Sequence, residues 1–450
     1  MNARYRPVLA SQFRRIPQLS RLGDSLLGEM EIVARVLPFK ANQYVLDELI
    51  DWSRAPNDPI FQLIFPHREM LPAEDFSRLE RLVRDHATAD TIAAAVSGIR
   101  LSLNPHPADQ RGVNVPRLAG VRLEGLQHKY RETVLFFPKS GQTCHAYCAF
   151  CFRWPQFVDE PDMRIALPDA QQLVDYLEAH NEVTDLLVTG GDPLTMSSRR
   201  LSQYLAVFST GKLEHVRNIR IGTKALSFWP HRFVSDDDAD DLLRLFERLV
   251  QAGRHVAVMV HINHPVELST PAVQTAVARI RATGAELRSQ SPVLRYVNDD
   301  PEVWSRLWCE QVRLGIHPYY MFVTRDTGAR SRFDLPLQRA YEIYRQAVAD
   351  VSGLARTARG PSMSTNAGKI EIQGVAQVGG ERAFVLSFIQ ARDPAWVRRP
   401  FFARFDPTAC WIDELRPLGG GGRFFFEEGA WSDEPQPLEA PATFFCDDGG

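Results

Sequence analysis

The chain of 450 residues has few cysteines and no strong excess of either charge. It contains six cysteines, 52 basic and 55 acidic residues, which give a formal net charge of −3. No basic tract indicates nucleic-acid binding, and no charge imbalance indicates a membrane surface. No apolar run approaches the roughly 18 residues of a membrane span, and the N-terminus lacks the apolar core of a signal peptide. We therefore expect a soluble cytoplasmic protein without disulfides, nucleic-acid partner or membrane partner.

Three of the six cysteines, Cys144, Cys148 and Cys151, nevertheless lie within eight residues of one another. Thiolates are soft ligands, and this C-x3-C-x2-C spacing can hold one metal cluster. A [4Fe–4S] cluster usually takes four cysteines, so three would leave one iron open to another ligand, such as S-adenosylmethionine. A zinc site is the competing interpretation. It would need a fourth ligand, which His145 cannot easily supply from the position next to Cys144.

Hydrophobic spacing divides the chain into three parts. Residues 1–125 are polar with helical periodicity, notably over 41–52 and 91–101, and are expected to cover a catalytic core. Between 126 and 355, six β-rich runs alternate with helical stretches, which predicts an α/β fold, an incomplete (βα)6 relative of the TIM barrel. Residues 356–450 form an α+β segment with a phenylalanine-rich end and a disordered tail that includes Cys446. The six predicted strands are 134–138, 186–189, 219–222, 256–262, 287–294 and 319–323.

Polar motifs follow these predicted strands, where the loops of such a barrel converge on one mouth. Gly190 and Gly191 would let the backbone approach a ligand closely. Asp192 could accept a hydrogen bond from the ammonium group of that ligand, or it could cap a helix instead. The remaining polar residues are candidates for the carboxylate, ribose and adenine of S-adenosylmethionine, or are structural polar groups. They are Lys224, His261, Asn263, His264 and Gln290.

In combination, the motifs resemble the lysine 2,3-aminomutase family of the radical S-adenosylmethionine superfamily. The resemblance extends from about residue 57 to about residue 372. It implies that the cluster and S-adenosylmethionine, reduced by a flavodoxin- or ferredoxin-type partner, generate a 5'-deoxyadenosyl radical. That radical would take a β-hydrogen from an amino acid attached to pyridoxal phosphate, and the amino group would move from the α to the β carbon. The matching segments are 128–130, 151–153, 221–224, 263–265, 295–300 and 318–320.

The resemblance also assigns roles to individual residues. Arg153 matches the arginine that binds the substrate carboxylate, and Lys369 matches the lysine that carries pyridoxal phosphate. Lys129 and Tyr130 match part of the phosphate-binding segment, but Thr133 stands where the family has a second arginine. The family's zinc-binding cysteines are missing from the C-terminal segment. We therefore expect no zinc and a different surface for any homo-oligomer.

The position at which lysine aminomutases hold the distal ammonium of lysine is occupied here by Arg325, with Asp326 beside it. A second such position falls on Ser362. An arginine would repel an ammonium by about 1 to 4 kcal/mol at contact distance in an intermediate dielectric. We therefore predict an amino acid with an acidic or neutral side chain, such as glutamate, rather than free lysine. A shift of one residue would bring in Asp326 and reverse this expectation.

Two other functions fit parts of the sequence. One is a radical S-adenosylmethionine enzyme on the same scaffold that acts without pyridoxal phosphate. The other is a cluster-bearing electron carrier without a substrate. The series of polar motifs at the strand ends argues against the carrier, because a carrier needs no cavity built from many loops.

Overall fold

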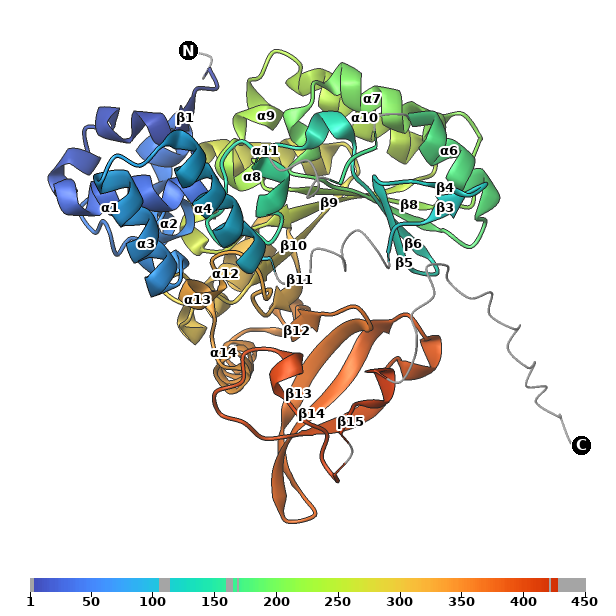
Figure 1. Cartoon of the computed structure of the whole chain (residues 1–450). Coiled ribbons are helices and arrows are strands. Elements are labelled where there is room, and N and C mark those ends of the chain that lie inside the picture. The colour runs from blue at the N-terminus through green and yellow to red at the C-terminus, as the bar shows by residue number, and fades with distance from the viewer. Residues whose placement is uncertain (1–3, 105–113, 159–164, 168–169, 421, 428–450) are drawn as a thin grey trace, which may run out of the picture.

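The computed structural model describes residues 4–104, 114–158, 165–167, 170–420 and 422–427. The tail that the sequence predicts to be disordered, with Cys446, lies outside these residues. The described chain is organised around an 11-stranded sheet in which the strands follow one another in sequence order from β5 to β15 (Figure 1). From β6 to β12, successive strands are joined by helices that cover the sheet.

Seven strands at the centre of the sheet are parallel neighbours. The first six coincide with the six predicted strands. The seventh belongs to the part of the chain that we had assigned to the C-terminal segment. The seven are β6 (Thr133–Phe136), β7 (Asp185–Val188), β8 (Asn218–Thr223), β9 (His255–His261), β10 (Glu286–Pro292), β11 (His317–Phe322) and β12 (Arg359–Ser364).

Antiparallel strands extend the sheet on both sides. β5 (Leu126–Tyr130) pairs with β6, and beyond β12 follow β13 (Gly368–Val378), β14 (Glu381–Ala391) and β15 (Pro400–Arg404). These last three strands project away from the parallel core in Figure 1. Away from the main sheet, β3 (Arg117–Leu118) pairs with β4 (Val121–Arg122).

The helices along the sheet have the start and stop signals that the sequence carries. Asp300 and Thr270 cap two of them, each followed by a proline at the first helical position. Gly253, Gly284 and Gly315 lie just beyond helix ends with φ of 81°, 85° and 81°, where a left-handed backbone favours glycine. The helices are α6 (Ala170–Ala179), α7 (Ser198–Leu205), α8 (Ala225–Phe228), α9 (His231–Val234), α10 (Ala239–Gln251), α11 (Pro271–Ala282), α12 (Pro301–Leu314), α13 (Arg330–Phe333) and α14 (Leu337–Ala349).

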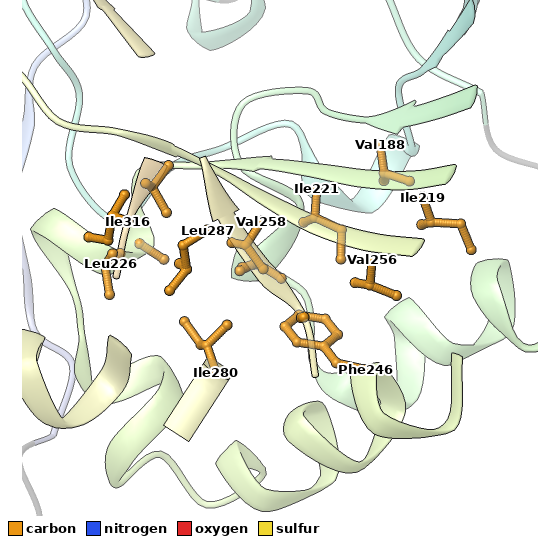
Figure 2. Packing of buried hydrophobic residues seen from close by; sticks show 14 of the residues in the cluster. Val188, Ile219, Ile221, Leu226, Phe246, Val256, Val258, Ile280, Leu287 and Ile316 are labelled. Atoms are coloured by element: carbon orange, nitrogen blue, oxygen red, sulfur yellow. The ribbon is translucent and has the colours of Figure 1, made fainter. Parts of the chain in front are cut away.

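Alternation along the strands decides which side chains enter the core. On β8, Ile219 and Ile221 are buried, and they pack with Val258 and Phe246 between the sheet and its helices (Figure 2). Arg220, between the two isoleucines, is only partly buried and belongs to the opposite face of the sheet. The helix-covered face is therefore apolar, and the opposite face can carry charged groups.

The N-terminal region contains β1 (Pro7–Leu9), β2 (Lys40–Asn42), α1 (Asp24–Val36), α2 (Pro59–Ile64), α3 (Ala73–Arg84) and α4 (Ala89–Ser102). The helix predicted over 91–101 is present as α4. The helix predicted over 41–52 is confirmed only over 43–49, where its last part, Val45–Leu49, is π-helical, because residues 40–42 pair as β2 with β1. The buried Asn42 side chain accepts the N–H of Val45 at 3.0 Å, which separates the strand from that helix.

The N-terminal helices share one hydrophobic cluster with the loop that carries the three cysteines. Phe61 and Phe65, stacked at 4.4 Å between ring centroids, belong to the same cluster as Ala146, Phe150 and Trp154. Within the described residues, no helix has the length and apolar character needed to cross a membrane.

Candidate active site

The cysteine loop, residues 143–151, is held in place by the N-terminal region. The N–H of Tyr147 donates to the carbonyl of Lys40 and the N–H of Ala149 to that of Leu63, both at 2.7 Å. The carbonyl of His145 accepts the Tyr5 hydroxyl at 2.8 Å and the Asn42 amide at 3.1 Å. The N-terminal region therefore does more than cover the core. It fixes the backbone that presents the three thiols.

All three cysteines of the loop are free and partly buried. Burial raises the pKa of each thiol; for Cys144, Asp192 and the other two cysteines raise it further. A cation opposes this rise at each cysteine. Within the described ranges, no three His, Cys, Asp or Glu side chains already form a metal-binding group. The fit to a cluster rests on the proximity and chemistry of the thiols. The cysteine–cation pairs are Cys144 with Lys40, Cys148 with Lys224, and Cys151 with Arg153.

The two glycines after β7 allow a close approach, but to the protein's own backbone. A Cβ on Gly191 would lie 2.6 Å from both the backbone N and O of Thr143. A Cβ on Gly190, where φ is 155°, would lie 2.9 Å from the carbonyl oxygen of Gly141. The two glycines therefore bring the second strand-end loop against the cysteine loop, and the room they would make for a ligand stays a prediction.

Asp192 acts as a cap in this structure. Its carboxylate accepts the N–H of Leu194 at 2.9 Å, the N–H of Lys224 at 2.8 Å, and the Thr223 hydroxyl at 2.8 Å to each oxygen. The side chain is 1 % exposed. The structure shows the capping alternative, and the expected role of Asp192 as an acceptor for a ligand's ammonium stays a prediction.

Lys224 is likewise satisfied internally. Its ammonium donates to the Glu267 carboxylate at 2.6 Å, to Asn263 Oδ1 at 3.0 Å and to the carbonyl of His261 at 3.1 Å. An ammonium has three donors, and all three are used. Lys224 therefore ties the end of β8 to the loop after β9, and its expected contact with the cofactor stays a prediction.

His261 and Gln290 remain candidates for contacts with a bound ligand. The centroid of the His261 ring lies 5.6 Å from that of the Phe150 ring in the cysteine loop. Burial keeps the pKa of His261 well below its ordinary value, so the imidazole is neutral. Among the described residues, His261 Nε2 and Asn263 Nδ2 are buried without a hydrogen-bond partner, which suits a site meant for a polar ligand. Gln290 on β10 pairs in register with His261 and is partly buried. His264 instead caps the following turn by accepting the N–H of Val266 at 3.3 Å.

Lys369 lies near the start of β13 between two aromatic rings. Its Nζ is 5.3 Å from the ring centroid of Tyr130 and 5.1 Å from that of Tyr320. It also donates to Gln390 Oε1 at 3.2 Å. Burial lowers the pKa of Lys369 to about 7, and two neighbouring guanidiniums lower it further, against a smaller opposing effect of two carboxylates. The guanidiniums belong to Arg220 and Arg359, and the carboxylates to Asp185 and Glu132.

The other residues assigned to phosphate binding lie close to this lysine. Lys129 lies 5.2 Å from the ring of Tyr130, and its ammonium donates to the carbonyl of Thr365. The Thr133 hydroxyl donates to Asp185 at 3.0 Å, and Asp185 also forms a two-pronged ion pair with Arg220. Sequence reasoning missed Arg220. The polar positions alternating with isoleucines on β8 were the signal that could have identified it.

Arg153 and Arg325, which the sequence assigns to substrate binding, lie on the same phenylalanine. Their guanidinium carbons are 5.0 and 5.5 Å from the Phe152 ring centroid. Burial lowers the pKa of Arg153 to about 10, and the charge of Arg325 lowers it further, against a rise caused by Cys151. Asp326 forms a 3.9 Å ion pair with Arg325. These are the two residues that a one-residue shift in the alignment with the family would exchange. Ser362 is buried and donates to the carbonyl of Met321 at 3.5 Å.

Comparison with known proteins identifies the family. No family model matches the chain. A protein of Aquifex aeolicus (strain VF5), described as "Putative L-lysine 2,3-aminomutase", is 31% identical over 391 residues, which cover 87% of this chain and 91% of that protein. The chain belongs to the lysine 2,3-aminomutase family. Membership in this radical S-adenosylmethionine family implies a [4Fe–4S] cluster and S-adenosylmethionine, and makes the chain an enzyme.

The substrate does not follow from membership in the lysine 2,3-aminomutase family. L-lysine 2,3-aminomutase of Haemophilus influenzae (strain ATCC 51907 / DSM 11121 / KW20 / Rd) is 27% identical over 329 residues, 72% of this chain and 82% of that protein. Glutamate 2,3-aminomutase of Clostridioides difficile (strain 630) is also 27% identical, over 212 residues, 47% of each chain. This chain is thus equally identical in sequence to a relative named for a cationic substrate and to a relative named for an anionic one.

Proposed function

We propose that this enzyme moves the amino group of an amino acid between its 2 and 3 carbons with the help of pyridoxal phosphate carried on Lys369. The state of Lys369 is the observation that carries the proposal. A neutral amine is the form that attacks a carbonyl carbon, and burial beside Arg220 and Arg359 favours that form at neutral pH. The same guanidiniums would attract a phosphate.

The cluster belongs to the proposal through the cysteine loop. Cys144, Cys148 and Cys151 would hold three irons and leave the fourth to S-adenosylmethionine, with His261 and Gln290 as polar contacts for that ligand. A flavodoxin- or ferredoxin-type partner would supply the electron. We further propose that the six strands from β6 to β11 curve into the partial (βα)6 barrel, with this site inside it.

The bound groups would supply one-electron chemistry at the cluster and stabilisation of the migrating amino group by pyridoxal phosphate. The chain's own residues then bind and orient. Arg153 offers two parallel donors for the substrate carboxylate. The rings of Tyr130 and Tyr320 flank the Lys369 amine and exclude water from it.

The proposed substrate has an acidic or neutral side chain. Arg153 and Arg325 both lie against Phe152, and each adds positive charge to one region of the site. Asp326 offsets part of the charge of Arg325 at 3.9 Å but leaves Arg153 for the carboxylate. A second cationic group on the substrate would enter a region that already contains two guanidiniums.

Identifying the lysine to which pyridoxal phosphate attaches tests whether the enzyme uses this cofactor. Protein incubated with pyridoxal phosphate and reduced with borohydride should carry the label on Lys369, as found by peptide mass spectrometry. Lys369→Ala should lose the label, whereas Lys129→Ala should keep it on Lys369. Label on another lysine, or none on the cluster-bearing wild type, would sink this proposal.

A second candidate is a radical S-adenosylmethionine reaction without pyridoxal phosphate. Thr133 favours it, because it replaces an arginine of the family and places its hydroxyl on the Asp185 carboxylate. Formation of 5'-deoxyadenosine that needs a substrate amino acid but is unchanged in Lys369→Ala would select this candidate.

The substrate proposal has its own measurement. Anaerobic protein is screened with single amino acids for release of 5'-deoxyadenosine, and glutamate should exceed lysine. Arg325→Asp should raise turnover of lysine relative to glutamate, and Arg325→Lys should not. The wild type turning over lysine clearly faster than glutamate would refute the proposed preference.

A further inference from the structure

Lys40, in the N-terminal region, places an ammonium beside the first cysteine of the loop. Its Nζ donates to the Thr143 hydroxyl at 3.2 Å, and Thr143 immediately precedes Cys144. Lys40 also faces the rings of Tyr5 and Tyr147, with centroids at 5.8 and 5.6 Å, within the range of a cation–π contact. These contacts hold the Lys40 ammonium in one position beside the loop.

The two other cations near the cysteines differ from Lys40 in their anionic partners. Lys224, near Cys148, is paired with the buried carboxylate of Glu267 at 2.6 Å. Arg153, near Cys151, is the residue proposed to receive the substrate carboxylate. Among the described residues, Lys40 makes no ion pair with a carboxylate. Its positive charge beside Cys144 is therefore not neutralised by an ion pair.

Three carboxylates lie close enough to matter, and each has other partners. Asp192 acts on Cys144, but it accepts the N–H groups of Leu194 and Lys224. Lys40 and Cys144 line a cavity of about 380 Å³, together with Asp236 and Asp238. Asp238 is paired with Arg232 at 2.7 Å, and Asp236 accepts the indole N–H of Trp229 at 3.0 Å. Among the described residues, none of these acids forms an ion pair with Lys40.

An iron–sulfur cluster gains one negative charge when it is reduced by one electron, and nearby net charge is one of the factors that set its potential. A fixed cation stabilises the reduced, more negative form, most strongly where protein limits screening by water. We propose that Lys40 is a positioning residue that makes the cluster easier to reduce by holding a positive charge beside Cys144 that no ion pair neutralises. This inference rests on the proposed cluster.

The test is a redox titration of reconstituted full-length protein, with titanium(III) citrate as reductant and the reduced cluster counted by electron paramagnetic resonance. In Lys40→Met the ratio of reduced to oxidised cluster at a fixed potential should fall about tenfold, which for a one-electron couple corresponds to about 59 mV. Lys40→Arg keeps the charge and should stay within about twofold of the wild type, a span of about 18 mV by the same constant.

Two control variants separate charge from other effects. Tyr5→Phe keeps the ring under Lys40 but removes the hydroxyl that holds the His145 carbonyl, so it disturbs the loop without removing charge. Lys212→Met removes an exposed lysine elsewhere. Both should titrate like the wild type. A shift in Tyr5→Phe as large as that in Lys40→Met would overturn the inference, because loop position would then explain both.

The remaining outcomes also decide the question. An unchanged ratio in Lys40→Met overturns the role of Lys40. If Lys40→Met and Lys40→Gln both lose iron and Lys40→Arg keeps it, the charge holds the cluster instead of setting its potential, and the inference is again overturned. Iron and sulfide analysis of the wild type separates these results from failure of the proposed function. Without a cluster in the wild type, the proposed function itself fails.

Discussion

At Lys369, burial and charge act on the amine in the same direction. The pKa is lowered from 10.5 to about 7, so the neutral amine predominates above neutral pH. The unfolded chain therefore holds more protons at this site between pH 7 and 10.5, and this residue's contribution makes the folded protein more stable as pH rises through that window.

The rate at which pyridoxal phosphate attaches to Lys369 should consequently rise through about pH 7 and level off above it. An ordinary lysine, with a pKa near 10.4, would keep gaining reactivity up to about pH 10. Mass spectrometry of the borohydride-reduced peptide, sampled over time at each pH, gives the midpoint. Lys129→Ala serves as the matched control and should not move it. A midpoint above about pH 9 would contradict the buried environment of the amine.

The cysteines allow a simple assignment of ligands. Replacing Cys144, Cys148 or Cys151 with alanine should abolish the iron–sulfur absorbance or the reductive cleavage of S-adenosylmethionine, because each removes one thiolate of three. Cys309 is exposed on α12 and outside the loop, and its replacement should leave both unchanged. Iron analysis and visible absorbance measure the first effect. If Cys309→Ala lost the cluster as completely, the ligand assignment would be wrong.

Sequence reasoning at this scale proposes reactive residues but not their partners. Lys369, Arg153 and Arg325 are assigned from their match to the family, and their roles stay predictions. Asp192 and Lys224 were assigned to a ligand, yet their hydrogen bonds go to Thr223 and Glu267. A sequence does not show which polar groups a fold brings within 3 Å, so a satisfied buried charge and a binding charge look alike in it.

At the scale of elements, the contact between two loops should be sensitive to a single methyl group. In Gly191→Ala the new Cβ would lie 2.6 Å from backbone atoms of Thr143, which cannot move aside as a flexible side chain could. We expect a loss of roughly 1–3 kcal/mol of stability, as for other overpacked sites, and lower iron content on reconstitution. Chemical denaturation and iron analysis measure the two effects.

The matched control is Gly28→Ala in the middle of α1, where a Cβ meets nothing within 4 Å. Alanine is favoured over glycine inside a helix by about 1 kcal/mol, so this variant should gain stability slightly and keep its iron. A stable Gly191→Ala protein with full iron would show that the two loops are not pressed together.

Helices and strands with clear local sequence signals were predictable, whereas those that depend on long-range pairing were not. The six strands and the helices between them were predictable, because each has a clear period and local caps such as Asp300 and Gly315. β12 was not predicted as a seventh parallel strand, because its place depends on pairing with β11, a long-range contact. The helix predicted over 41–52 is shorter in the structure, 43–49, because the pairing of β2 with β1 takes up residues 40–42.

For the whole molecule, the N-terminal region was the part least accessible to prediction. Its sequence carries no motif, and its role comes from distant contacts: Lys40 and Leu63 carbonyls, the Tyr5 hydroxyl and the Asn42 amide all meet the cysteine loop. If that region were only a cover, damage to it would lower stability without affecting the cluster. If it fixes the loop, the two effects must occur together.

Asn42 distinguishes these possibilities, because it joins three parts of the chain. Its amide donates to the carbonyls of His145 at 3.1 Å and Phe228 at 2.9 Å, and its oxygen accepts the N–H of Val45 at 3.0 Å. Asn42→Ala leaves buried partners unpaired and should cost about 1–3 kcal/mol of stability, with a parallel loss of iron retention. Asn42→Asp should be worse at neutral pH, since a carboxylate would face two carbonyl oxygens. Gln43→Ala, next along the chain but exposed, should change neither quantity. Denaturation curves and the rate of iron loss to a chelator provide the measurements. An Asn42→Ala protein that is destabilised yet retains iron like Gln43→Ala would show that the N-terminal region does not hold the cysteine loop.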